Sequence, residues 1–171
     1  MACDPAGKGL AEAHGRPFLG NVPETVRTHL AAGYELLSDD VDSAPAEKGA
    51  YALVLLLGAP VQFARRRTHV SIAPGWYVYA GNAHGPGGIR ARLRRHLRSG
   101  KTRHWHIDDL TNAAREKHAI VSVGGSECEI IARLSAICSF KTALAGFGSS
   151  DCRICAAHLL RYYPVISSSD P

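Results

Sequence analysis

A continuous apolar run from Tyr51 to Leu57 is followed by a mixed polar and apolar run and then by a second apolar run, and only short turns separate the three. The turns are Gly58-Ala59-Pro60 and Pro74-Gly75, and the runs beside them are Val61–Ile72 and Trp76–Ala80. Runs of this kind predict strands, and connections this short favour antiparallel pairing. The sequence therefore predicts a local antiparallel sheet, with the first run as a buried strand and the arginine-bearing second run at an edge.

A helix is predicted after the glycine-rich turn that follows the third run. Ile89, Leu93 and Leu97 recur at four-residue spacing, which is typical of one apolar stripe on a helix over residues 89–97. Arg92 and His96 share a second face of that helix. We therefore expect Arg92 and His96 to point in the same direction.

Further elements complete an α+β pattern. Ser126 and Glu129 have the spacing of a capping box, which predicts a helix that continues to about Ser139. A short helix from Val22 to Gly33 is also expected. Two more apolar segments predict strands, at Ala119–Val123 and at Ala156–Tyr163. Strands and helices mixed in this order, with local hairpins first, favour the α+β class.

The domain organisation follows from composition. Residues 1–47 are predicted to be an N-terminal extension, partly disordered and with one short helix, that ends in an acidic linker. Residues 48–164 form the compact domain, and residues 165–171 form a tail. No run approaches eighteen apolar residues and no secretion signal opens the chain, so we expect no membrane partner. The odd count of five cysteines fits a reducing cytoplasm.

The charge is unevenly distributed. No Asp or Glu occurs from Lys48 to Ile107, whereas eight of the fifteen acids precede Lys48. A basic span of this length predicts a surface suited to a polyanion, so we expect a nucleic acid as the partner, ahead of an anionic membrane or an acidic protein. The expected contacts lie in and after the predicted helix: Arg90, Arg94, Arg95, Arg98, Lys101, Arg103, His104 and His106.

Several residues could support phosphodiester hydrolysis, which needs an activated water and a neutralised transition state. Tyr51 and Tyr79 could supply a base or an orienting hydroxyl, although a phenol of pKa about 10 acts as a base only where cations or a metal lower that pKa. Arg92 could hold a phosphate oxygen, and Glu127 or Glu129 could hold a divalent metal. The structural alternative is packing for the tyrosines, solvation for the arginine and helix-dipole compensation for the glutamates.

Gly49-Ala50-Tyr51 and Tyr79-Ala80-Gly81 resemble the name motif of the GIY-YIG nuclease superfamily, with alanine in place of isoleucine. The helix Ala91-Arg92-Leu93-Arg94-Arg95-His96-Leu97 follows as in that superfamily. The chain is similar in particular to a branch that occurs alone or fused to an endonuclease III-type glycosylase. The shared blocks lie in order between Lys48 and Pro164: Gly85-Pro86-Gly87-Gly88, His104-Trp105-His106-Ile107-Asp108, Glu127-Cys128-Glu129 and Gly148-Ser149-Ser150-Asp151-Cys152.

The resemblance implies a small α+β domain with an antiparallel sheet of about three strands flanked by helices. It also implies an endonuclease that hydrolyses DNA in repair or processing, with Mg²⁺ or Mn²⁺ as cofactor. By the resemblance, Tyr51 is the general base for water, Tyr79 helps to hold the water or the phosphate, and Arg92 stabilises the transition state. His96 stands where relatives carry another hydroxyl or imidazole group near the phosphate.

The metal-binding glutamate departs from the family pattern. In the repair-incision relatives it lies further along its helix, at a position near Leu134 here, and leucine cannot bind a metal. Glu127 and Glu129 lie about two turns earlier. Either one of them takes the role, or Asp108 or Asp151 does, or the metal site is altered. A nucleic-acid-binding module of the same fold that does not cleave is therefore the alternative to a nuclease.

Two other segments allow more than one interpretation. Cys152, Cys155 and His158 resemble part of a zinc site, and a fourth ligand could be Cys128, His104 or His106. A strand over Ala156–Tyr163 would instead turn Cys155 and His158 to opposite faces and separate them. The segment His104-Trp105-His106-Ile107-Asp108 either faces a substrate or metal, or is anchored to the core by Trp105 and Ile107 with its histidines solvated.

Overall fold

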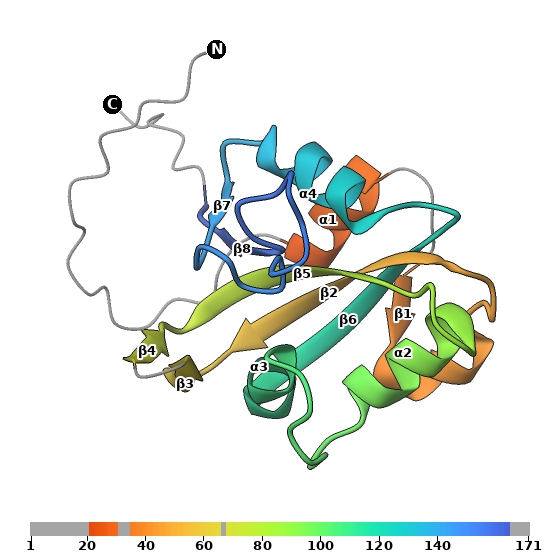
Figure 1. The fold of residues 1–171 in the computed structure, drawn as a ribbon, viewed down its shortest axis with the longest axis horizontal. Helices are drawn as coiled ribbons and strands as arrows, with labels where there is room; N and C mark the ends of the chain where they lie inside the picture. The colour runs from red at the N-terminus through yellow and green to blue at the C-terminus, as the bar shows by residue number, and fades with distance from the viewer. Residues whose placement is uncertain (1–20, 31–34, 66–67, 165–171) are drawn as a thin grey trace.

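A six-stranded sheet forms the centre of the computed structural model, which describes residues 21–30, 35–65 and 68–164 (Figure 1). Every strand pairing within these residues is antiparallel. In spatial order the strands are β1 (Glu35–Leu37), β6 (Ala114–Val123), β2 (Gly49–Leu57), β5 (Gly75–Asn82), β8 (Leu159–Tyr162) and β7 (Phe140–Thr142). The α+β class is confirmed, and the expectation of about three strands is wrong, because the short strands β1, β8 and β7 extend the three long strands β6, β2 and β5 on both sides.

The central run behaves as predicted, and the second run does not. Strand β2 pairs directly with β5 in the sheet. The run Val61–Ile72, expected as one edge strand, forms β3 (Val61–Arg65) and β4 (Thr68–Ile72), which pair with each other in a separate sheet. This hairpin packs over the main sheet because its inward residues Phe63 and Ile72 join the core beside β2.

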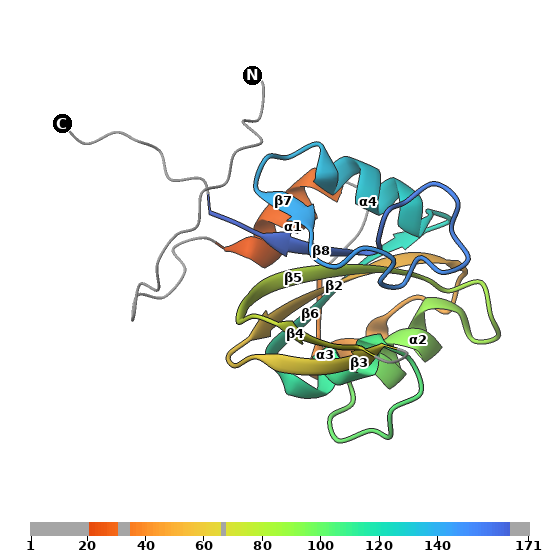
Figure 2. The same cartoon turned by 60° about the vertical axis from the view of Figure 1, so that its left-hand side comes forward.

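Two layers cover the sheet, one on each face (Figure 2). Helices α1 (Val22–Leu30) and α4 (Glu127–Ser135) lie on one face. Helices α2 (Gly88–Leu97) and α3 (Ile107–Ala113) lie on the other, together with the β3–β4 hairpin. Strand β2 serves both cores, because its odd-numbered residues from Tyr51 to Leu57 join one cluster and Ala50, Ala52 and Val54 join the other. This explains why its sequence is apolar throughout.

The described part of the predicted N-terminal extension is built into the domain. Helix α1 buries Val22 and Val26 against α4 and β2, which confirms the short helix and gives it a core position. Strand β1 pairs with β6, and a 3₁₀ segment η1 (Ser38–Ser43) packs on α2. The described residues 21–30 and 35–43 therefore complete one edge of the sheet and contribute to the layers on both of its faces. Residues 1–20 of the predicted, partly disordered extension and the tail 165–171 lie outside the described residues.

The segment before β2 also caps α2, the helix that carries Arg92 and His96. The backbone N–H groups of Ile89 and Arg90 donate to the carbonyl oxygens of Glu47 (3.0 Å) and Pro45 (2.9 Å). A Cβ at Gly88, where φ is 56°, would overlap the carbonyl of Ala46. Only glycine allows this approach, so the glycine-rich turn anchors the helix start to the predicted linker.

The remaining helices agree with the sequence in part. Ser126 accepts a hydrogen bond from the backbone N–H of Glu129 (3.2 Å), so the predicted cap of α4 is confirmed, although the helix ends at Ser135. Helix α3 was not predicted. The closing strand β8 is shorter than expected and starts at Leu159, which leaves His158 outside it. Among the described residues, no helix combines the length and apolar character needed to cross a bilayer.

Candidate active site

The two tyrosines of the paired motifs lie on the same face of the sheet. Tyr51 pairs with Gly81 across β2 and β5, and Leu53 pairs with Tyr79, so the two phenols are diagonal neighbours. The ring of Tyr51 lies over Gly81, where an added Cβ would overlap the phenol. The glycine that ends the second motif thus makes room for the tyrosine that ends the first.

Tyr51 is hydrogen-bonded to His96 in a buried pair. The phenol oxygen lies 2.8 Å from Nε2 of His96, and the exposed fractions are 3% for Tyr51 and 2% for His96. Burial lowers the pKa of His96 to about 3, despite the opposing charge of Asp108, so the ring is neutral. His96 Nδ1 faces Asp108 Oδ1 at 3.9 Å. A proton on Nδ1 suits that carboxylate, and Nε2 then accepts the hydrogen bond from Tyr51.

Asp108, in the first turn of α3, connects α2 to the loop before α3 through its hydrogen bonds. Its side chain is fully buried, and Oδ2 accepts hydrogen bonds from Arg95 (2.7 Å) and from the backbone N–H groups of His104 (2.8 Å) and Trp105 (2.9 Å). Burial raises the pKa of Asp108, but these N–H donors outweigh burial and the net pKa is lowered. Asp108 is thus a charged structural anchor with no face open to solvent, which argues against it as the metal carboxylate.

Arg92 and Trp105 form the rim of the site. The Arg92 guanidinium lies 4.8 Å from the centre of the Trp105 ring, and Arg95 lies 4.6 Å from the same centre. Within the described residues, no carboxylate forms an ion pair with Arg92. Its positive charge is therefore available to a ligand.

These side chains line one cavity of about 320 Å³. Arg92 and His96 enter it from the same face of α2, as the helical spacing predicted. Tyr51 and Tyr79 enter from the sheet, and Trp105 enters from the loop before α3. The full lining is Tyr51, Tyr79, Asn82, Arg92, His96, Trp105, Ile107 and Asp151.

Both phenols in the cavity are neutral. Burial raises the pKa of Tyr51 well above 10, with a further increase from Tyr79 and a smaller opposing effect from Arg92. Burial and the charge of Glu127 raise the pKa of Tyr79 to about 12, again against Arg92. The nearby cations therefore do not produce the lowered phenol pKa that a preformed phenolate base would require.

The structure separates the two candidate glutamates. Glu127 accepts a hydrogen bond from the side chain of Asn82 (3.1 Å) and its charge acts on both tyrosines. Glu129 points elsewhere: it pairs with Arg133 (2.6 Å) beside a small cavity against α1. Asp151 lines the tyrosine cavity from the opposite loop. Glu127, Asp151 and the amide oxygen of Asn82 are thus the oxygen donors next to the phenols.

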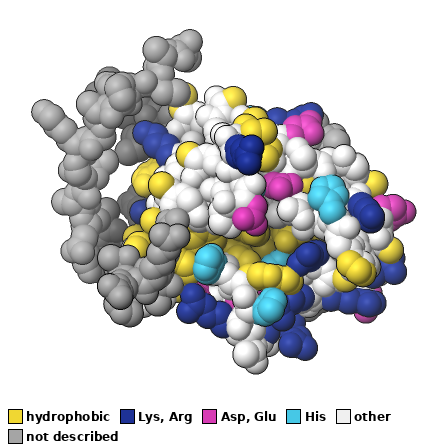
Figure 3. Space-filling model, in the orientation of Figure 1, with side chains coloured by type: hydrophobic (Ala, Val, Ile, Leu, Met, Phe, Trp, Pro, Cys, Tyr) yellow, Lys and Arg dark blue, Asp and Glu magenta, His cyan; other side chains and the backbone are white. Residues whose placement is uncertain are grey.

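The basic surface is less continuous than the sequence suggested. Carboxylates from outside the acid-free span form ion pairs with arginines within it. Asp42 pairs with Arg94, Asp108 with Arg95 and Asp109 with Arg103. Arg90 donates to the carbonyl of Ala44 (2.7 Å). Lysine and arginine side chains still gather over the lower part of the face in Figure 3, around α2 and α3, with histidines beside them.

Lys101 is not available as the predicted DNA contact. It is 4% exposed, and its Nζ donates to Thr111 Oγ1 (2.6 Å) and to the carbonyl oxygens of His96 (2.9 Å) and Arg98 (3.3 Å). Burial lowers its pKa to about 8. The side chain satisfies the last carbonyls of α2, which is a structural role.

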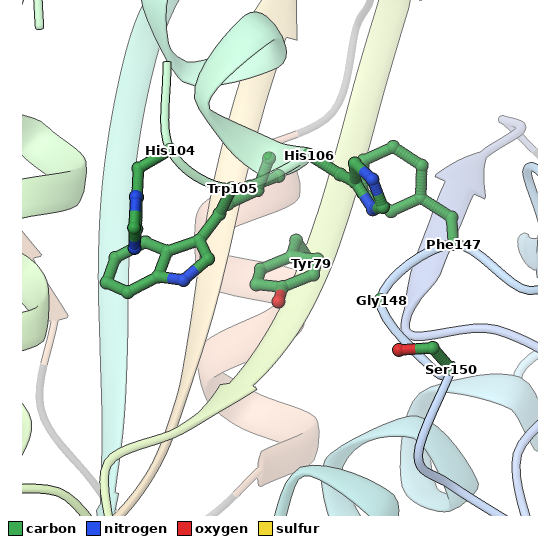
Figure 4. A pocket seen from close by; sticks show the side chains of 8 residues that line it. Tyr79, His104, Trp105, His106, Phe147, Gly148 and Ser150 are labelled. Carbon is green, nitrogen blue, oxygen red and sulfur yellow. The ribbon is translucent and has the colours of Figure 1, made fainter. Parts of the chain in front are cut away.

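A second cavity of about 270 Å³ adjoins the first along Tyr79, Trp105 and Ile107. Figure 4 shows His104 and Trp105 on one side of Tyr79, and His106 beside the ring of Phe147 on the other. His104 and His106 are exposed while Ile107 is buried. The segment 104–108 therefore combines both interpretations, because Ile107 and Asp108 anchor it and the rings on either side line cavities.

A third group gathers the predicted sulfur ligands. Cys152, Cys155 and His158 lie together with Cys128 of α4, and their ligand atoms are all within 4.8 Å of one another. His104 and His106, the other candidates for a fourth ligand, line the second cavity, which we call the aromatic cavity because Tyr79, Trp105 and Phe147 also line it. The expected strand over Ala156–Tyr163 would have turned Cys155 and His158 to opposite faces. The observed strand β8 starts only at Leu159, so both residues lie before it and can meet.

Two members of the site were not predicted by sequence. Asn82 follows the second motif directly and ends β5. Its position, a polar residue directly after the motif, was the sequence feature that could have indicated a site residue. Phe147 lies in a loop with no regular pattern, and it reaches Tyr79 (ring centres 6.2 Å apart) only through the fold.

Comparison with protein families gives one assignment. The model of a family described as Domain of unknown function DUF123 matches residues 50–169. The chain belongs to the DUF123 family. The DUF123 match begins one residue before Tyr51 and includes both cavities and the cysteine group. No match was found among curated proteins or among solved structures.

Proposed function

We propose that this DUF123 protein is a metal-dependent endonuclease of the GIY-YIG type that hydrolyses phosphodiester bonds in DNA. The observation that carries the proposal is the convergence of Tyr51, Tyr79, Arg92 and His96 on one cavity beside a basic surface. An unpaired guanidinium next to two phenols suits a phosphate with a water beside it. The adjoining aromatic cavity supports DNA as the substrate, because exposed rings there can stack on a base.

The Tyr51–His96 pair supplies a route for the proton of the attacking water. A neutral phenol that donates to a neutral imidazole can accept a proton from water at its oxygen while its own proton passes to Nε2. The carboxylate of Asp108, 3.9 Å from Nδ1, favours the imidazolium formed on His96 and opposes the burial that lowers the pKa of that ring. The hydroxide then attacks phosphorus, the bond to the leaving oxygen breaks, and Arg92 neutralises the charge on the phosphate.

The oxygen donors beside the phenols fit a hard divalent cation. Glu127, Asp151 and the amide oxygen of Asn82 are the ligand types that Mg²⁺ and Mn²⁺ prefer, and both carboxylates are solvent-accessible. When bound, such an ion would offset the negative charge on the leaving oxygen. Glu129 is not included, because Arg133 already pairs with it and it faces another cavity.

One observation favours the alternative, a DNA-binding module that does not cut. Tyr51 is only 3% exposed and its phenol is neutral, so a water must enter a tight site to be activated there. Such a module would bind DNA with a log–log salt slope of about −0.9 per phosphate neutralised and would release no product.

A cleavage panel distinguishes the two functions. Purified protein is incubated with flapped, branched, damaged and single-stranded DNA, each with Mg²⁺, Mn²⁺ or chelator, and binding is measured in parallel. The nuclease predicts metal-dependent products that Arg92→Ala abolishes and that Arg133→Ala, an arginine outside the cavity, leaves unchanged. Salt-dependent binding without product under every metal condition would support the binding module instead.

A further inference from the structure

Four metal-binding side chains meet where the 146–158 loop touches the start of α4. Cys128 lies in the first turn of α4, and Cys152, Cys155 and His158 lie in the loop. Cys128 Sγ is 3.5 Å from Cys152 Sγ and 4.0 Å from His158 Nε2. The three cysteines are free thiols, half-buried, and the histidine is buried.

These separations match the edges of a zinc tetrahedron. With Zn–S bonds of about 2.3 Å, tetrahedral geometry puts two ligand sulfurs roughly 3.8 Å apart. The Sγ–Sγ separation of 3.5 Å lies close to that value. With a Zn–N bond of about 2.0–2.1 Å, a sulfur and a nitrogen ligand should lie roughly 3.6 Å apart, and the Sγ–Nε2 separation is slightly longer at 4.0 Å. No pair of the four ligand atoms exceeds 4.8 Å. One ion at the centre would reach all four atoms after small movements of side chains.

The local backbone is arranged for a bound thiolate. Cys152 Sγ accepts hydrogen bonds from the backbone N–H groups of Ile154 (3.4 Å) and Cys155 (3.3 Å). Such donors stabilise negative charge on sulfur, and the turn that provides them also brings Cys155 beside Cys152. Sulfur and imidazole ligands in a tetrahedral set favour zinc over magnesium or manganese.

We propose that Cys128, Cys152, Cys155 and His158 bind a structural Zn²⁺ ion that fastens the 146–158 loop to α4. Three cysteines and one histidine fill the four positions of a tetrahedral ion and leave none open for water or substrate. The site is therefore structural and differs from the oxygen-lined metal site of the proposed nuclease.

The zinc would also position the neighbouring active site, a consequence that rests on the proposed function. Glu127 precedes Cys128 and Asp151 precedes Cys152, so each residue with a candidate carboxylate is the sequence neighbour of a proposed zinc ligand. The same loop passes close over Tyr79: a Cβ at Gly148, where φ is 69°, would lie 2.7 Å from that ring. Fastening the loop to α4 thus fixes Asp151 of the loop relative to Glu127 of the helix, and it fixes one wall of the tyrosine cavity.

Metal analysis of the full chain tests the site without any DNA. Protein purified without chelator under reducing conditions should contain one zinc per chain, and replacement by Co²⁺ should give the visible spectrum of a tetrahedral ion with thiolate charge-transfer bands. Cys152→Ser and Cys155→Ser should lose the bound metal. A control variant outside the group, His84→Ala at an exposed histidine, should keep it.

If the cysteine variants do not fold, measurements on the wild-type protein alone still test the zinc site. A strong chelator should lower its melting temperature, and added Zn²⁺ should restore it, since an ion that binds only the folded state stabilises that state. Wild type that contains no zinc, takes up no Co²⁺ in tetrahedral form and melts unchanged with chelator would overturn the proposal. Nuclease activity enters none of these measurements, so its absence would not affect this result.

Discussion

Acidification should destabilise the fold through His96, the buried partner of Tyr51. The ring has a pKa of about 3 in the folded chain, compared with 6.5 for an exposed histidine. Between these values the unfolded chain binds a proton and the folded chain does not, so acid favours unfolding. Asp108 does not offset this loss, because its pKa is lowered and it stays charged. From about pH 7 to about pH 5, His96 alone should remove about 2 kcal/mol from the free energy of unfolding.

Urea denaturation at the two pH values measures this loss, and the same change should lower the melting temperature by roughly 4–8 °C. His96→Gln removes the ionisable ring while it keeps a polar group near Tyr51, so its acid loss should be smaller by about 2 kcal/mol. His84→Ala, at an exposed histidine, should behave as wild type. Equal acid losses in wild type and His96→Gln, or an imidazole that titrates near its ordinary pKa by NMR, would refute the reasoning.

Three further predictions follow from particular contacts. Gly81→Ala should cost roughly 1–3 kcal/mol in thermal denaturation, because the added methyl displaces the Tyr51 ring; an unchanged melting temperature would contradict the close approach. Asp108→Asn should cost on the order of 3 kcal/mol in urea denaturation, since it leaves Arg95 without its buried carboxylate; a loss below about 1 kcal/mol would contradict its anchoring role. Arg98→Ala, at an exposed arginine, should reduce the salt slope of DNA binding by about one; an unchanged slope would remove Arg98 from the interface.

Local patterns were sufficient for the elements that hold the tyrosines and the arginine. The apolar run of β2, the alternation in β5 and the four-residue spacing in α2 each predict an element whose bounds agree within two residues. The expectation that Arg92 and His96 share a face needs only helical geometry. These parts succeeded because each pattern is set by neighbours along the chain.

Elements that depend on distant partners were not predicted. Strands β1 and β7 are three residues long, too short for periodicity, and they exist because β6 and β8 offer them an edge. The pairing of Arg94 with Asp42 and the burial of Lys101 likewise require the fold, since sequence alone gives charge without position.

The sulfur group shows the same limit of local pattern. C-x-x-C-x-x-H indicated three candidate ligands and left Cys128, His104 and His106 open for the fourth position; only the fold brings Cys128, 24 residues before Cys152, to the group. Glu127 and Glu129 are two positions apart in sequence, and only the orientation of α4 turns one toward the phenols and the other toward Arg133.

Single-turnover cleavage of DNA by Tyr51→Phe shows whether the Tyr51 hydroxyl takes part in hydrolysis. Removal of one hydroxyl deletes the proton route through His96 and should slow cleavage in Mn²⁺ by about 100-fold or more. Tyr77→Phe is the matched control, because Tyr77 lies on the same face of the sheet but outside the cavity. Its hydroxyl donates a hydrogen bond to the carbonyl oxygen of Ala73. The account predicts near wild-type cleavage by Tyr77→Phe and a large loss in Tyr51→Phe. Equal cleavage by wild type and Tyr51→Phe would contradict it.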